Sequence, residues 1–124
     1  MGEKAAEKLV FISTFGGEDP ERASSPFVWA NAALAMDCEV VVILQGTAVT
    51  LAVKGCYEHV FAPHKPPLKE LVDNFLEMGG TLLACTPCLQ ERQITQDQLI
   101  ESVQTIKAAR LITECLEAVS TVCM

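Results

Sequence analysis

Two cysteines separated by two residues are the groups in this sequence best suited to chemistry. Cys85 and Cys88, with a Thr-Pro dipeptide between them, stand where the apolar run 81–84 ends and a polar, helix-forming segment begins at Leu89. A thiol at such a junction lies beside free backbone N–H groups and the positive end of a helix dipole. Both favour the thiolate, which is the reactive form of cysteine. The sequence therefore predicts sulfur chemistry at Cys85.

Three other interpretations of this pair stay open. The two cysteines could be incidental, because the chain has six cysteines in all. A structural zinc site needs four ligands, whereas this motif supplies two, and His59 and His64 belong to a separate segment, so no metal is expected. A dithiol that cycles with its disulfide is the third interpretation, although such motifs normally lie near the first strand of their fold.

The other four cysteines are expected to be less reactive. Cys38, Cys115 and Cys123 lie in apolar runs, where a free cysteine usually acts as a small buried hydrophobe. Cys56 follows a glycine near a turn and is ambiguous. Nothing marks the chain as secreted, so a disulfide framework is not expected.

Length and charge narrow the function classes. The chain has 124 residues, enough for one domain (1–124) with a single core, and half of its residues are hydrophobic. A formal net charge of −7 without a basic stripe disfavours nucleic acid as a partner. The apolar runs are too short to cross a bilayer, and no signal-peptide pattern opens the chain. We expect a soluble, cytoplasmic protein.

Short apolar runs without helical periodicity predict buried parallel strands. The expected strands are 8–13, 38–44, 81–84 and 119–122. Amphipathic segments between them predict helices at about 24–36, 47–55, 67–78 and 95–118. Ser24-Ser25-Pro26 supplies an N-cap and a first-turn proline for the first helix, after a polar loop at 16–21, and a capping box at Thr95 opens the last one. Alternating strands and helices imply an α/β protein with a parallel sheet covered on both faces.

Loops at one edge of this sheet are expected to build the site. Parallel sheets of this class bind ligands outside the carboxyl ends of their strands, where the loops after 8–13, 38–44 and 81–84 converge. The residues expected around this cleft are Gly16, Gly17, Gln45, Gly46, Cys85 and Cys88. The glycine pair lacks a nucleotide-binding pattern, so no cofactor is expected.

Several stretches of the chain resemble the DsrE/DsrF-like family, which includes the sulfur-relay TusD-like proteins. The resemblance covers nearly the whole length and is carried by the stretches 11–23 (FISTFGGEDPERA), 26–33 (PFVWANAA), Gly46, 66–71 (PPLKEL) and 85–95 (CTPCLQERQIT). Family members place a cysteine at the end of this strand and an arginine seven residues later, as Cys85 and Arg92 do here. Gln93 stands where glycine is usual.

The resemblance implies a single-domain three-layer α/β sandwich with a mostly parallel, five-stranded sheet of flavodoxin-like topology. It also implies homo-oligomers, often trimers or hexamers, and cytoplasmic sulfur handling. In sulfur-relay members the strand-end cysteine, matched here by Cys85, carries a persulfide and passes its outer sulfur to a partner protein. Cys88 matches a second cysteine that some branches have and others lack.

Three functions follow for comparison with the structure. The first is a sulfur carrier or sulfurtransferase that holds sulfane sulfur on Cys85, with Arg92 adding positive charge if it folds back, and exchanges that sulfur with donor and acceptor proteins. The second is a redox protein that uses Cys85 and Cys88 as a dithiol. The third is a non-enzymatic oligomeric module that binds a small ligand in the cleft.

Overall fold

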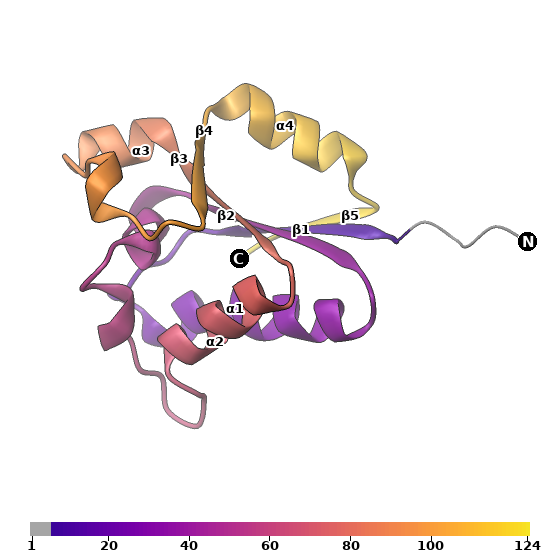
Figure 1. Cartoon of the computed structure of the whole chain (residues 1–124), viewed down its shortest axis with the longest axis horizontal. Coiled ribbons are helices and arrows are strands. Elements are labelled where there is room, and N and C mark those ends of the chain that lie inside the picture. Colours follow the sequence, from indigo (N-terminus) through magenta and orange to yellow (C-terminus); the bar gives the residue numbers. More distant parts are fainter. Residues whose placement is uncertain (1–5) are drawn as a thin grey trace, which may run out of the picture.

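Residues 6–124 are described in a computed structural model, in which five strands alternate with helices (Figure 1). The strands are β1 (Lys8–Ser13), β2 (Glu39–Leu44), β3 (Thr81–Cys85), β4 (Val103–Ile106) and β5 (Ser120–Cys123). The helices are α1 (Pro20–Ala35), α2 (Leu68–Glu77), α3 (Thr86–Glu91) and α4 (Ala108–Glu117), with 3₁₀ turns η1 (Gly46–Ala52), η2 (Tyr57–His59) and η3 (Gln96–Gln98). The start of the expected domain, at residue 1, lies outside the described residues.

The strands form one all-parallel sheet with the order β4-β3-β2-β1-β5. Helices α1 and α2 cover one face and α4 covers the other, so the chain is a three-layer sandwich (Figure 1). This confirms the expected α/β class and the five-stranded parallel sheet. The strand order is not the 2-1-3-4-5 order of flavodoxin itself.

Burial on both faces explains the composition of the central strands. β2 reads EVVVIL, and every residue after its first is buried, as expected for a parallel strand covered on both sides. On one side it packs into the main core, where Phe27 of α1 and Phe75 of α2 meet edge to face with ring centroids 5.7 Å apart. On the other side Val41 and Ile43 belong to a smaller cluster under α4.

The first helix begins earlier than the sequence indicated. Asp19 is its N-cap, with a carboxylate oxygen that accepts a hydrogen bond from the Arg22 N–H at 3.1 Å, and Pro20 occupies the first turn. The expected cap at Ser24 is wrong, because the hydroxyl of Ser24 donates to the Pro20 carbonyl at 2.7 Å inside the helix. Pro26 lies within the helix and does not start it.

The expected helix at 95–118 is also wrong. Thr95 and Gln98 do form a capping box, but it caps the start of only a single turn, η3. The chain then extends into β4, of which Val103 and Ile106 are the buried residues. Their spacing of three residues imitates a helical face, which explains the error. The helix in this region is α4, which starts at Ala108.

The segments that follow β3 and β4 pack on opposite faces of the sheet. After β3 the chain packs Leu89 and Leu99 into the core on the α1/α2 face, whereas after β4 it enters α4 on the other face. A crevice at the carboxyl ends of such neighbouring strands is the usual ligand site of open α/β sheets. In residues 6–124 no helix is long and apolar enough to span a membrane.

Candidate functional site

Cys85 lies in this crevice, as the last residue of β3 and the N-cap residue of α3. Its in-register partner on β4 is Ile106, and its thiol is half-buried. Pro87 falls in the first turn of α3, where its missing N–H costs nothing. A buried strand followed directly by a proline-started helix therefore fixes the position of the thiol.

A small cavity adjoins this cysteine. It has a volume of about 70 Å³ and lies between the ends of β2, β3 and β4 and the first turn of α4. Its lining residues are Ile43, Gln45, Cys85, Pro87, Ile106, Lys107, Ala108 and Leu111. Most of these side chains are hydrocarbon, with one amide and one ammonium group among them.

Cys88 stands beside Cys85 in the first turn of α3. Its Sγ accepts a hydrogen bond from the backbone N–H of Gly46 at 3.3 Å. Its carbonyl oxygen accepts another from Nη1 of Arg92 at 3.0 Å. The structure thus brings Gly46, Cys88 and Arg92 together, and Arg92 does fold back onto the helix that follows Cys85.

The surroundings of Cys85 favour the thiol over the thiolate. Burial raises the pKa of Cys85, the side chains of Cys88 and Glu91 raise it further, and the backbone N–H of Cys88 lowers it by less. The predicted preference for the thiolate is therefore wrong. The cavity walls are apolar and α3 has only 6 residues. Desolvation of the thiol therefore raises its pKa by more than the backbone N–H groups at the start of α3 lower it.

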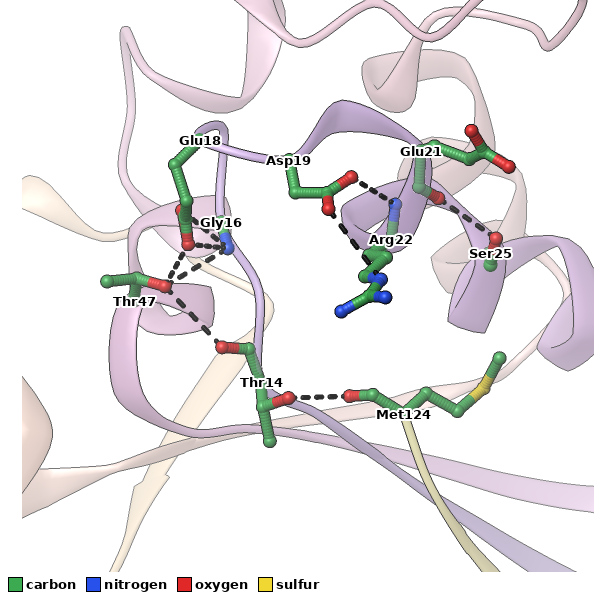
Figure 2. A network of polar contacts seen from close by, with 9 residues as sticks. All are labelled: Thr14, Gly16, Glu18, Asp19, Glu21, Arg22, Ser25, Thr47 and Met124. Atoms are coloured by element: carbon green, nitrogen blue, oxygen red, sulfur yellow. Dashed lines mark hydrogen bonds and ion pairs between the residues drawn. The ribbon is translucent and has the colours of Figure 1, made fainter.

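The loop after β1 is connected to Thr47, the second residue of η1, by hydrogen bonds (Figure 2). The Glu18 carboxylate accepts from the N–H of Gly16 at 2.8 and 3.1 Å and from the Thr47 hydroxyl, which also lies 3.4 Å from the carbonyl of Thr14. The Thr14 hydroxyl in turn donates to the Met124 carbonyl at 2.7 Å. Because Thr47 directly follows Gly46, this network connects the loop after β1 to the turn that contacts Cys88.

Glu18 is the charged member of this network. Burial acts to raise its pKa, but the hydrogen bonds from Thr47 and Gly16, together with the positive charge of Arg92, lower the pKa below the ordinary value. Glu18 therefore stays ionised beside the site.

The predicted site residues are only partly brought together. Gln45 lies with Cys85 along the cavity, and Gly46 contacts Cys88. Gly16 is connected to this group through Thr47, the neighbour of Gly46. Gly17 is exposed and faces Val60. The sequence does not indicate Lys107 and Leu111, because the apolar spacing of β4 predicts part of a helix there and no loop.

The remaining cysteines differ from one another in exposure. Cys38 and Cys115 are half-buried, whereas Cys56 and Cys123 are exposed, so the expectation that Cys123 is buried is wrong. All six cysteines are free thiols. Among residues 6–124 no group of three or more His, Cys, Asp or Glu side chains is placed to hold a metal ion.

Comparison with solved structures supports the fold. The chain superimposes on the ychN protein of E. coli with a TM-score of 0.81 and 17% identity, covering 95% of this chain and 99% of that one. MTH1491 of Methanobacterium thermoautotrophicum, a protein of unknown function, gives a TM-score of 0.77 and 14% identity over 95% and 99% of the two chains. BT1422 of Bacteroides thetaiotaomicron, also of unknown function, gives 0.66 and 15% over 95% of each chain.

Comparison of sequences identifies the family. The chain is 31% identical over 106 residues to the uncharacterised protein MJ0760 of Methanocaldococcus jannaschii. This match covers 82% of the chain but 38% of the relative, so the chain spans about two fifths of that protein's length. The model of the DsrE/DsrF-like family matches residues 7–123. The chain therefore belongs to the DsrE/DsrF-like family.

Proposed function

We propose that this protein is a sulfur carrier or sulfurtransferase that holds sulfane sulfur as a persulfide on Cys85. The observation that carries the proposal is the position of Cys85, a half-buried thiol next to a small cavity at the carboxyl end of β3. Family membership supports the same chemistry, because DsrE/DsrF-like proteins include sulfur-relay components.

The proposed reaction has two displacement steps. The Cys85 thiolate attacks the outer sulfur of a donor persulfide, the new S–S bond forms as the donor S–S bond breaks, and the donor leaves as a thiolate. An acceptor thiolate then attacks the outer sulfur on Cys85, which regains its own thiolate. No oxidant or reductant is consumed, since sulfane sulfur keeps its oxidation state.

Cys88 has a different role in this proposal. Its sulfur is held by the Gly46 N–H, and its side chain influences the ionisation of Cys85 directly. From that position its thiolate can attack the Sγ of a Cys85 persulfide, which forms the Cys85–Cys88 disulfide and releases hydrosulfide. The same proximity favours a second candidate function, a dithiol redox protein that uses this pair.

The net charge, the exposed apolar side chains and the free thiols suggest the partners, the oligomeric state and the cellular compartment. We infer donor and acceptor proteins with basic surfaces, because the chain carries a net charge of −7. We also infer a homo-oligomer such as a trimer or hexamer, since α4 exposes Ile112 and Leu116, with 54% and 81% of their surface accessible. Six free thiols suit a reducing compartment, and we place the protein in the cytoplasm.

Intact-protein mass spectrometry after incubation with a polysulfide donor tests these functions. The starting protein carries Cys56→Ser and Cys123→Ser, because these exposed thiols would also react. A gain of one sulfur mass that Cys85→Ser abolishes and Cys88→Ser spares supports the carrier. A loss of two hydrogens that needs both cysteines supports the redox protein. No change in any variant contradicts both and leaves the small-ligand module.

A further inference from the structure

Cys88 is held by two contacts, and both of them are linked to Glu18. The Sγ of Cys88 accepts the hydrogen bond from the Gly46 N–H at 3.3 Å, and its carbonyl oxygen accepts from Nη1 of Arg92 at 3.0 Å. Gly46 precedes Thr47, whose hydroxyl donates to the Glu18 carboxylate (Figure 2). The charge of Arg92 lies close enough to Glu18 to lower its pKa. Glu18 is therefore connected to Cys88 from both sides.

The backbone of Gly46 does not by itself fix the direction of its N–H group. Its φ of +58° lies in the left-handed region, and glycine has access to many other conformations. On one side the Gln45 N–H donates to the last carbonyl of β1 at 2.9 Å. On the other side the Thr47 hydroxyl donates to Glu18 and accepts from the Gly16 N–H at 3.3 Å. The side chain of Thr47 therefore helps to set where this N–H points.

The N–H of Gly46 prepares Cys88 for attack on its neighbour. A backbone N–H that donates to a thiol sulfur stabilises the thiolate over the thiol. The side chains of Cys85 and Cys88 are also hydrogen-bonded to each other, so their sulfur atoms are neighbours. A nucleophile that is already held next to its target reacts faster than a mobile one, because its orientation is set in advance.

We infer that Thr47 and Glu18 are positioning residues that control how long Cys85 keeps its sulfur, because they hold the Gly46 N–H on Cys88. This inference rests on the proposed persulfide role of Cys85. In the resolving step the Cys88 thiolate attacks the Sγ of Cys85, the S–S bond of the persulfide breaks, and its electron pair leaves with the outer sulfur as hydrosulfide. The Cys85–Cys88 disulfide is the other product, so a single turnover consumes no outside reductant.

Two pairs of variants separate this role from a general effect on the fold. Thr47→Val removes the hydroxyl and keeps the shape of the side chain, whereas Thr47→Ser keeps the hydroxyl, and Thr47 is exposed. Thr121→Val is the matched control, because it removes the same hydroxyl from an exposed position of β5. Glu18→Ala removes the carboxylate that Thr47 contacts, and Glu21→Ala removes the same group from the first turn of α1.

The experiment measures the rate at which loaded protein converts its persulfide to the disulfide. Cys85 is loaded briefly with inorganic polysulfide, the donor is removed in acid, and return to neutral pH starts the reaction, which intact-protein mass spectrometry follows. All proteins carry Cys56→Ser and Cys123→Ser, and circular dichroism checks their fold. We expect Thr47→Val to slow hydrosulfide release about threefold to tenfold, since a hydrogen bond to the attacking sulfur is weakened. Thr47→Ser and Thr121→Val should release it as fast as the parent.

The Glu18 variant and the dependence on Cys88 complete the test. Glu18→Ala should slow the release as Thr47→Val does, and Glu21→Ala should not. Because both residues act through one contact, the double variant Thr47→Val/Glu18→Ala should be no slower than the slower single variant. When Cys88→Ser is also present, Thr47→Val should change neither the loading rate nor the lifetime of the Cys85 persulfide. A general loss of structure would change both.

The results distinguish failure of this inference from failure of the proposed function. If Thr47→Val and Glu18→Ala release hydrosulfide as fast as the parent or faster, or if Thr47→Val acts equally without Cys88, the two residues do not act through Cys88 although Cys85 still carries sulfur. The inference also fails if the loaded parent forms no disulfide. If no protein loads sulfur on Cys85, with Cys88→Ser included, the persulfide role fails, and the inference that rests on it fails as well.

Discussion

At the scale of single residues, the reactivity of Cys85 depends on the balance between an apolar environment and a nearby N–H group. The higher pKa of Cys85 lowers the fraction of thiolate at neutral pH. Each thiolate that forms is, however, a stronger nucleophile, because nucleophilicity rises with pKa. Burial of the thiol, together with the neighbouring Cys88, therefore sets the pH range in which Cys85 reacts.

Removing the Cys88 side chain should lower the pKa of Cys85. The side chain of Cys88 raises that pKa, whereas its backbone N–H lowers it and remains in Cys88→Ala. The rate of Cys85 alkylation by iodoacetamide, followed by peptide mass mapping across pH, should therefore rise at lower pH in Cys88→Ala than in the parent. Cys123→Ala, at an exposed thiol on β5, should leave the profile unchanged. A profile that stays in place or moves to higher pH contradicts this account.

Gly16 is required for close contact between the loop after β1 and η1. A Cβ at Gly16 would lie 2.5 Å from the Thr47 carbonyl oxygen and 2.7 Å from the Thr50 hydroxyl oxygen. We expect Gly16→Ala to lower the free energy of unfolding by about 1–3 kcal/mol, as overpacking does. It should also weaken the Gly46–Cys88 contact, because Gly46 precedes Thr47.

The neighbouring glycine provides the control. A Cβ at Gly17 would meet only a Val60 methyl group, at an ordinary 3.5 Å. Gly17→Ala should therefore change stability by less than about 0.5 kcal/mol. Urea unfolding of the two variants compares these values, and equal losses at both positions would contradict the packing argument.

The position of Cys85 and Cys88 in the fold could be predicted from the sequence, but the direction of the Cys85 pKa shift could not. Their placement was predictable because a strand end followed by a helix start is visible in the residue pattern. The shift was not predictable because its largest cause is burial of the thiol, which depends on how distant segments of the chain pack around it. Glu18 was also missed, since only the fold brings it to Thr47.

At the scale of elements, one ion-pair network attaches α4 to the sheet. Lys8 at the start of β1 contacts Glu114 and Glu117 of α4 at 2.5 and 2.9 Å, and Arg110 contacts Glu114 at 2.6 Å. Glu114 is buried, with 6% of its surface accessible. Burial acts to raise the pKa of Glu114, but its hydrogen bonds and ion pairs with Lys8 and Arg110 lower it below the ordinary value.

Lys8→Met should destabilise the protein, because it leaves a buried carboxylate with one partner fewer. We expect a loss of about 2 kcal/mol, less than for a fully buried pair, since Arg110 remains. Lys69→Met, which breaks an exposed pair with Asp73 on α2, should leave the unfolding midpoint unchanged. Equal effects of the two substitutions in thermal unfolding would contradict this role for the network.

The contribution of this network should depend on pH. The folded-state pKa of Glu114 is depressed, so its stabilisation is present above the ordinary carboxyl value of 4.5 and is lost as pH falls through the folded-state pKa. The difference in unfolding free energy between the parent and Lys8→Met should therefore shrink in acid. Urea unfolding at a series of pH values measures it, and a difference that grows in acid would contradict the assignment.

Whether a segment forms a helix or a strand was predictable where its apolar spacing agrees with the Gly and Pro residues that flank it, as in β2 and α2. It was not predictable where local signals conflict with tertiary contacts. Asp19-Pro20 and Ser24-Ser25-Pro26 are both good helix starts, and packing of Ala23 and Phe27 against the sheet selects the earlier one. The apolar spacing of β4 suits a helix as well as a strand, and pairing with β3 decides between them.

At the scale of the whole molecule, the apolar surface on α4 predicts association. Ile112 and Leu116 lie one helical turn apart, and Val119 follows at the entry to β5, with 63% of its surface accessible. Leu116→Glu should convert the proposed oligomer to a monomer in sedimentation experiments, because it buries a charge at the contact. Gln90→Glu, which adds the same charge at an exposed position of α3, is the control. A parent protein that sediments as a monomer would contradict the proposal.

The crossing from β4 to β5 has a consequence for how the chain folds as it is synthesised. β1 is made first but acquires its second neighbour only when β5 emerges, and the Thr14–Met124 hydrogen bond spans 110 residues. Until then one edge of β1 has unpaired backbone groups and can pair with another nascent chain. Because β5 is the last strand of this sheet to be made, that edge of β1 stays open to association until β5 pairs with it.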